Sequence, residues 1–240
     1  MKFVPGHLSD VITPNLPPVF ELSHGSRALG DLTPSGLFLI DYYWVSQKPY
    51  SSYEVVVDST SGDIGPTLHV DRVQSGTTTS LQSSVPVGVG FTRSLRFMNT
   101  AAVENNNEAI AVRSGQCTTD CGPDDVYFIR GYETTYSIPR FNNFGTQVTV
   151  LLLQNPTNYT INGNIYFWST NSILVGTHSF TLTEKQLLVL NTSTVPSANG
   201  VGGSVTIAHD GRYGDLSAKT VALEPATGFS FDSPALPRLP

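Results

Sequence analysis

Residues 68–71 read Leu68-His69-Val70-Asp71, and the alternation of apolar and polar side chains in this stretch decides the fold class. A period of two residues is that of a β-strand with one buried face, whereas an amphipathic helix repeats its apolar residues every three or four positions. The stretch Leu95-Arg96-Phe97 repeats the alternation later in the chain. No segment has the period of a helix of useful length. The sequence therefore predicts an all-β protein and excludes parallel βαβ folds, which need crossover helices.

Short apolar runs bounded by turn-forming residues extend from these stretches in both directions. In the first half of the chain the predicted strands are 36–44, 52–58, 67–73, 94–99, 109–114 and 126–133. In the second half they are 147–154, 164–169, 177–182, 186–191, 203–209 and 220–224. The most apolar run, Val148–Leu153, predicts a buried strand with Leu152 among its most sensitive positions. Asn162-Gly163 predicts a tight hairpin turn, because both central residues of a type I′ turn adopt positive φ.

The two sets of strands predict two tandem antiparallel β-sandwich domains of the jelly-roll or immunoglobulin-like kind. We expect the first sandwich over residues 34–135 and the second over 136–232. An extended, proline-containing arm is expected over 1–33 and a proline-rich tail over 233–240. A chain of 240 residues is comfortable for two domains of ordinary size.

Residues 36–134 resemble the pre-peptidase C-terminal-type sandwich of secreted bacterial proteins. The resemblance lies in Ile40-Asp41-Tyr42-Tyr43, in Tyr53-Glu54-Val55-Val56-Val57 and in Asp125-Val126-Tyr127-Phe128-Ile129. It implies an accessory module that works beside other secreted domains and has no catalytic activity. It also implies an extracellular or cell-surface location.

Residues 146–224 are similar to the β-sandwich of sensory-rhodopsin-transducer-like proteins. The similarity lies in Thr149-Val150-Leu151-Leu152-Leu153 followed by Asn155-Pro156, and in Gly163-Asn164-Ile165-Tyr166-Phe167. The run Ala208–Gly214 resembles segments of uncharacterised bacterial surface proteins. None of these families supplies a catalytic residue that can be placed on this chain.

Composition and charge exclude two classes of partner. Only 13% of the residues are charged and the net charge is −6, with the 13 lysines and arginines scattered singly. Nucleic acid is bound mainly through clustered Lys and Arg, so no nucleic-acid partner is expected. No apolar stretch reaches the roughly 18 residues that a membrane-crossing helix needs, so no membrane span is expected.

The start of the chain and its cysteines bear on location. Met1–Gly6 begins with a positive charge, but no apolar segment follows, so no signal peptide is visible. A cytoplasmic protein, a processed chain and export by another route all stay open. Cys117 and Cys121, the only two cysteines, could pair as a loop disulfide in an oxidising compartment, which favours export.

The same loop could hold a structural calcium ion. Asp120, Asp124 and Asp125 cluster around the cysteines, and calcium takes six to eight oxygen ligands, often from one carboxylate-rich loop. The spacing does not match an EF-hand loop. A turn whose Asp side chains bond local amides is the alternative. No other cofactor is expected.

Aromatic residues suggest a sugar-binding surface as an alternative function. Trp44 belongs to a cluster at the start of the first sandwich, and strand alternation puts Tyr166 and Trp168 on one face in the second. An exposed pair could stack on pyranose rings. Buried, the same side chains would be part of a core.

A secreted hydrolase is the other alternative. His209 and Asp210 could lie near a serine hydroxyl, and a carboxylate pair could come from Asp124, Asp125, Asp210, Asp215 and Glu224. No nucleophile-elbow or zinc-protease motif is present. We therefore predict no enzymatic activity.

The leading expectation is a non-catalytic structural or interaction protein of the cell exterior. Open sandwiches have edge strands, which proteins must cover, charge or use. Few lysines are available to protect them, namely Lys2, Lys48, Lys185 and Lys219. We therefore expect protein partners or self-association, including a role as a subunit of a larger assembly.

Overall fold

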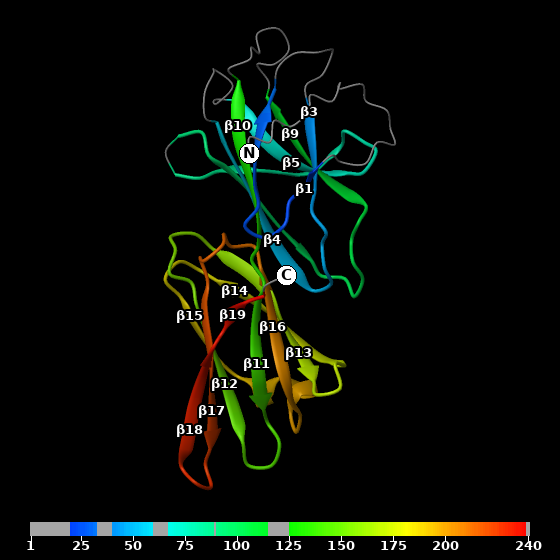
Figure 1. Ribbon diagram of the computed structural model, residues 1–240. Helices are drawn as coiled ribbons and strands as arrows, with labels where there is room; N and C mark the ends of the chain where they lie inside the picture. Colours follow the sequence, from blue (N-terminus) through cyan, green and yellow to red (C-terminus); the bar gives the residue numbers. More distant parts are fainter. Residues whose placement is uncertain (1–19, 33–39, 60–66, 89, 115–124, 239–240) are drawn as a thin grey trace, which may run out of the picture. The chain divides into compact units, whose positions relative to one another are not determined.

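The structure is a computed structural model that describes all residues except 1–19, 33–39, 60–66, 89, 115–124 and 239–240. It confirms an all-β protein built from antiparallel-rich sheets (Figure 1). The chain forms two compact units that are not contiguous in sequence. Unit 1 comprises Met1–Lys48, Glu54–Arg96 and Val103–Tyr132. Unit 2 comprises Pro49–Tyr53, Phe97–Ala102 and Glu133–Pro240.

Two five-stranded sheets form the frame of unit 1, in the orders β1-β3-β9-β5-β6 and β2-β10-β4-β8-β7. The first residues of β4 and the last residues of β8 and β10 belong to unit 2. The strands are β1 (Phe20–Glu21), β2 (Arg27–Asp31), β3 (Ile40–Trp44), β4 (Ser51–Ser59), β5 (Leu68–Gln74), β6 (Ser80–Ser83), β7 (Val85–Pro86), β8 (Arg93–Asn99), β9 (Glu108–Ser114) and β10 (Val126–Glu133). Alternation of partly exposed and buried side chains along β10 shows why its sequence forms a strand with one inward face. The core draws on both sheets, through Val55, Leu68, Val70, Leu95, Ile110, Val112 and Ile129.

Unit 2 contains a five-stranded sheet, β14-β13-β16-β11-β19, and a four-stranded sheet, β15-β12-β17-β18. The strands are β11 (Tyr136–Asn142), β12 (Val148–Gln154), β13 (Ile161–Ser169), β14 (Leu174–Leu182), β15 (Leu187–Asn191), β16 (Gly202–His209), β17 (Ser217–Glu224), β18 (Phe229–Pro234) and β19 (Leu236–Pro237). Their inward side chains form one core, which includes Ile138, Phe141, Leu151, Leu153, Ile165, Phe167, Val205 and Ile207.

The helices of the described residues are two three-residue 3₁₀ turns, η1 (Thr192–Thr194) and η2 (Pro196–Ala198). Both lie between β15 and β16. Neither is long enough to cross a lipid bilayer.

Part of the segment expected to be an arm is integral to unit 1. β2 pairs with β10 from Arg27↔Arg130 to Asp31↔Val126, and Leu22 and Leu32 are buried. The expected tail likewise contributes β19, which pairs with β11 through Leu236↔Ser137. Residues 1–19 of the expected arm lie outside the described residues.

The prediction of a hairpin turn at Asn162-Gly163 was wrong, because both residues lie inside β13. Gly163 is needed there for close packing. A Cβ atom at this position would lie 2.4 Å from the carbonyl oxygen of Ala208 on β16 and 2.5 Å from the ring of Phe180 on β14. Glycine here allows neighbouring strands to approach closely. The sequence Asn162-Gly163 alone does not distinguish this role from a turn.

Candidate functional site

The predicted cysteine and calcium loop lies mostly outside the described residues. Cys117, Cys121, Asp120 and Asp124 are all in the undescribed segment 115–124. Asp125 is described and buried, and its carbonyl oxygen accepts a hydrogen bond from the Leu32 amide at 3.1 Å. Across the described part of the chain, no three His, Cys, Asp or Glu side chains gather closely enough to hold a metal ion. The disulfide and the calcium site remain predictions.

The three aromatic residues considered for sugar binding are divided between the two units. Trp44, in β3 of unit 1, is partly exposed. In unit 2 the ring of Tyr50 contacts both Tyr166 and Trp168, with ring centroids 4.8 Å and 5.2 Å apart. Tyr166 is only 3% exposed, and its burial raises the pKa of its phenol. Trp168 and Tyr50 are partly exposed, so a ligand could reach these two members of the cluster but not Tyr166.

Trp168 has a fixed orientation on the sheet. Its Nε1 donates a hydrogen bond to Thr206 Oγ1 on β16 at 3.1 Å. A register shift between Phe167 and Trp168 alters the strand locally, next to the β13–β14 turn. Across the β13–β16 ladder Trp168 pairs with Ser204. The indole therefore lies next to the first residues of β16.

His209 and Asp210 serve separate purposes. The imidazole of His209 is fully buried, its Nδ1 accepts the Gly211 amide at 3.1 Å, and its ring stacks on Tyr136 at 5.7 Å. The Asp210 carboxylate accepts the backbone amide of Asn162 at 2.7 Å and its side-chain Nδ2 at 3.0 Å. Asp210 thus holds the start of β13, and a carboxylate–imidazole pair for catalysis is not formed by these two residues.

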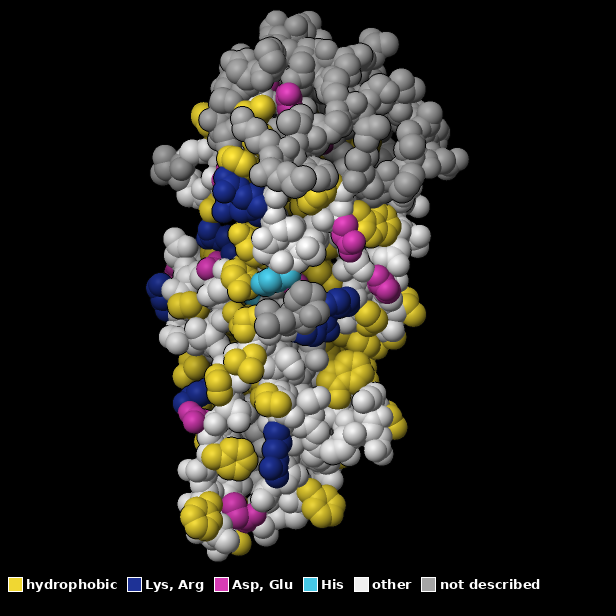
Figure 2. All heavy atoms as spheres, in the orientation of Figure 1, with side chains coloured by type: hydrophobic (Ala, Val, Ile, Leu, Met, Phe, Trp, Pro, Cys, Tyr) yellow, Lys and Arg dark blue, Asp and Glu magenta, His cyan; other side chains and the backbone are white. Residues whose placement is uncertain are grey.

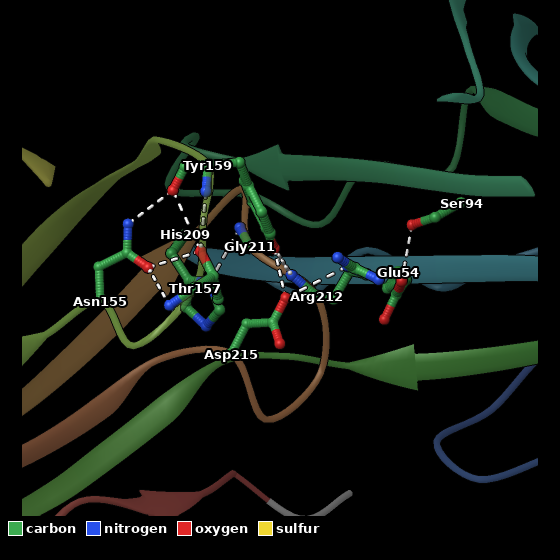
Figure 3. Close-up of polar contacts among 9 residues, drawn as sticks. All are labelled: Glu54, Ser94, Asn155, Thr157, Tyr159, His209, Gly211, Arg212 and Asp215. Atoms are coloured by element: carbon green, nitrogen blue, oxygen red, sulfur yellow. Dashed lines mark hydrogen bonds and ion pairs between the residues drawn. The ribbon is translucent and has the colours of Figure 1, made fainter. Parts of the chain in front are cut away.

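A buried asparagine organises the loop between β12 and β13 (Figure 3). Asn155 is fully buried, and its Nδ2 donates to the carbonyl oxygens of Tyr159, Leu182 and Thr183 at 2.7, 3.0 and 3.0 Å. Its Oδ1 accepts the amide and the hydroxyl of Thr157 at 2.9 and 2.7 Å. One side chain therefore provides hydrogen-bond partners for polar groups of this loop and for carbonyl oxygens at the end of β14. Without Asn155 these groups would be buried without hydrogen-bond partners.

The loop between β16 and β17 is joined to this asparagine-centred loop through Tyr159. Tyr159 donates its hydroxyl hydrogen to Asp215 Oδ2 and accepts the Arg212 amide at 3.0 Å (Figure 3). Arg212 Nε also pairs with Asp215 Oδ2 at 3.2 Å. Burial, and then the hydrogen bond to Asp215, raise the pKa of the Tyr159 phenol. The phenol stays protonated and ties the two loops together.

Glu224, also considered for glycoside hydrolysis, is held locally, and so is Glu54, which was not one of those candidates. Glu224 accepts the Thr146 hydroxyl at 2.7 Å and the Ala226 amide at 3.2 Å, which lowers the pKa of its carboxyl. In unit 1, Glu54 accepts the Ser94 hydroxyl at 2.6 Å (Figure 3). Each of these contacts stabilises a turn or a strand pair.

An open groove in unit 2, with a volume of about 560 Å³, is the feature that sequence reasoning missed. It is lined by residues of β11, of the β13–β14 turn and of the start of β16, namely Pro139, Arg140, Phe141, Asn142, Ser169, Thr170, Ser172, Gly202, Gly203 and Ser204. The polar side chains among these residues carry hydroxyl groups, one amide and one guanidinium. The one feature of the sequence that could have indicated the groove is the pair Gly202-Gly203, and this pair is equally typical of an ordinary turn.

Arg140 is the one charged residue among those that line the groove. Figure 2 shows one face of the molecule, on which hydrophobic side chains are interspersed with uncharged polar side chains and backbone, and acidic and basic groups are few and scattered. This agrees with the 13% of charged residues in the sequence. A single charge in a groove of this kind therefore has few competing partners.

Comparisons with known proteins give no family. No family model matches the sequence, and no curated protein sequence is similar to it. Among solved structures, the pre-peptidase C-terminal domain of a collagenase from Bacillus anthracis is similar over 49% of this chain and 98% of that domain, with 12% identity and a TM-score of 0.32. A β-glucuronidase from Bacteroides uniformis is similar over 87% of this chain but only 25% of its own, with 10% identity and a TM-score of 0.19.

A third similar solved structure comes from a virus. The VP2 subviral particle of infectious bursal disease virus is similar over 95% of this chain and 81% of its own, with 13% identity and a TM-score of 0.20. The similar structures thus include a pre-peptidase C-terminal domain, without a matching sequence family. At TM-scores below 0.5 these similarities assign no function.

Proposed function

We propose that the chain is a non-catalytic interaction protein of the cell exterior that associates with copies of itself or with other proteins. The observation that carries the proposal is the open edge strand β18. Phe229 and Phe231 share one face of this strand and are 77% and 51% exposed. The only charge on β18 belongs to Asp232, which pairs with Lys219 of the adjacent strand at 2.9 Å.

An edge strand of this kind is suited to strand addition. Proteins protect edges with lysines, inward-pointing charges, bulges or a covering segment. β11 on the opposite sheet is covered by β19, but β18 contains no lysine and has a proline only at its last position. Its backbone can pair with an incoming strand while the two phenylalanine rings give apolar contact.

The polar clusters support the non-catalytic part of the proposal. His209, Asp210, Asp215 and Glu224 each hold a loop or a strand end through the hydrogen bonds described above. The extracellular location is proposed on the resemblance of residues 36–134 to secreted modules and on the spacing of Cys117 and Cys121.

Light scattering coupled to size-exclusion chromatography tests the proposal. We expect association that increases with protein concentration and is lost in Phe231→Lys, which places a charge on the open edge. Phe144→Lys is the matched control, because Phe144 is 71% exposed but lies in the β11–β12 loop. A monomer at every concentration and with every candidate protein partner would refute the proposal.

A second candidate function, carbohydrate binding by unit 2, is favoured by one observation. The partly exposed Trp168 is the cross-strand neighbour of Ser204, which lines the groove. An aromatic face beside hydroxyl groups is a common arrangement for pyranose recognition. Binding on a glycan array should disappear in Trp168→Ala while the thermal melt shows that the protein is still folded. If Trp168→Ala still bound the glycans, the indole would have no role in binding.

A further inference from the structure

We infer that the groove of unit 2 binds acidic glycans, and that Arg140 pairs with the carboxylate of a uronic acid residue. This inference rests on the second candidate function, carbohydrate binding by unit 2. It adds the chemical class of the sugar and the residue that selects it.

Two glycines at the start of β16 line the groove. Gly202 and Gly203 begin β16, and a Cβ atom at Gly203 would lie 1.8 Å from the carbonyl oxygen of Trp168. Any other residue at this position would force the two strands apart. Glycine at this position is therefore set by the contact between β13 and β16, and it adds no side chain to the groove.

The walls of the groove supply hydrogen-bonding groups that are not used elsewhere. The hydroxyls of Thr170, Ser172 and Ser204 make no hydrogen bond within the part of the chain that the structure describes. A hydroxyl can both donate and accept, so these groups match the hydroxyls of a sugar. By contrast, Ser169 Oγ already accepts the amides of Asn171 and Ile173 at 3.3 Å.

Arg140 gives the groove its charge. It is exposed, and no carboxylate pairs with it among the described residues, whereas Arg212 and Arg238 of the same unit pair with Asp215 and Glu133. Its guanidinium lies 5.8 Å from the centre of the Phe231 ring, which restricts the side chain without neutralising it. No acidic residue lines the groove. A guanidinium binds a carboxylate through two parallel hydrogen bonds, so an acidic ligand is preferred to a neutral one.

The position of the groove favours a glycan over a peptide. Peptides that bind a sheet usually add a strand at an open edge. Strand β16, which contributes three residues to the groove, is paired on both sides, with β13 and with β11, so its backbone has no open edge to offer. One positive charge among small hydroxyl side chains suits a sugar ring with one carboxylate.

Calorimetric titration of the full chain with matched glycans tests the inference. The probes are oligomers of galacturonate, mannuronate and glucuronate, each compared with its methyl ester, which has the same ring but no charge. We expect the acidic form to bind about tenfold or more tightly than the ester. Arg140→Gln should remove this difference, and Arg140→Lys should restore part of it.

Two further variants separate the groove from general effects. Arg93→Gln removes one positive charge from unit 1 and should leave the preference unchanged. Ser204→Phe fills the groove and should abolish binding of acids and esters alike, with the thermal melt as the test of folding. Equal binding of acids and esters would overturn the inference but leave carbohydrate binding standing. Binding of none of the probes, or tighter binding of polyglutamate than of any glycan, would overturn both.

Discussion

Leu151 and Leu152 are neighbours in β12, yet their side chains lie on opposite faces of the sheet. Leu151 is fully buried in the core of unit 2, whereas Leu152 is partly exposed and pairs with Val189, which is 60% exposed. We expect Leu151→Ala to lower the free energy of unfolding by about 2–5 kcal/mol, because it leaves a cavity in a packed interior. Leu152→Ala should cost clearly less.

Urea unfolding of the two variants gives the comparison. The apolar run Val148–Leu153 predicted Leu152 as a sensitive position, and the structure gives that role to Leu151 and Leu153. An apolar run contains no alternation, so it cannot show which face is buried. A larger loss in Leu152→Ala than in Leu151→Ala would mean that this face is covered in solution.

Gly163 is a second residue whose importance comes from packing. Gly163→Ala should lower the free energy of unfolding by about 1–3 kcal/mol or more, because the new methyl group would overlap the Ala208 carbonyl oxygen and the Phe180 ring. Gly176→Ala, in the adjacent strand β14, is the matched control. Its Cβ would meet its nearest neighbour, Val195, at 3.4 Å, an ordinary contact. Equal melting temperatures for the two variants would contradict the account of Gly163.

At the scale of elements, strands with a clear apolar run or a regular alternation of apolar and polar residues could be predicted from the sequence. β10 has the predicted bounds, β9 and β12 differ from their predicted ranges by one residue at one end, and β5 differs by one residue at each end. β11 was not among the predicted strands, because Pro139 and Arg140 interrupt its pattern. The ladder to β16 shifts register at this same point, between Ile138 and Phe141. A bulge hides a strand from any reading that depends on strict alternation.

The groove could not be predicted because no local pattern encodes it. Its three lining segments lie at 139–142, 169–172 and 202–204, and only strand pairing brings them together. Serine, threonine and glycine in each segment are also the residues of ordinary turns. Trp168 could be singled out from the sequence, since tryptophan is rare in this chain, but its neighbour Ser204 could not.

The C-terminal strand offers a test at the scale of an element. Besides its ladder to β11, this segment places the Arg238 amide 2.8 Å from the Thr135 carbonyl oxygen and Arg238 Nε 2.5 Å from the buried Glu133 carboxylate. Deleting residues 235–240 should lower the free energy of unfolding by at least about 2 kcal/mol. It should also promote aggregation, because β11 becomes an open edge.

Arg238→Gln is the control for this deletion. It removes the ion pair but leaves the backbone pairing of β19, so it should destabilise the protein less and cause no aggregation. Urea unfolding and light scattering measure the two effects. A deleted chain as stable and as soluble as the full chain would show that β19 contributes nothing to unit 2.

At the scale of the whole molecule, two buried tyrosines predict how stability depends on pH. Tyr43 and Tyr127 lie between the sheets of unit 1, with their hydroxyls 2.8 Å apart, and Tyr127 donates to Asp41 Oδ2 at 2.5 Å. Burial, and then the charge of Asp41, raise the pKa of both phenols above the ordinary value. In the unfolded chain both would ionise near pH 10, roughly the value of a free tyrosine.

The sign of the effect follows from proton binding. Below about pH 10 both states hold the phenolic protons, and the stabilisation is complete. At higher pH the unfolded chain loses protons that the folded protein keeps, so the free energy of unfolding must fall until the folded pKa values are reached.

Urea unfolding at a series of alkaline pH values should show this decline, and tyrosinate absorbance should appear together with unfolding. Tyr127→Phe should make the decline shallower, whereas Leu151→Ala, which destabilises without removing a phenol, should keep the wild-type slope. Stability that does not change from neutral pH to well above pH 10 (roughly the free-tyrosine value) would show that these hydroxyls are open to water rather than enclosed between the sheets.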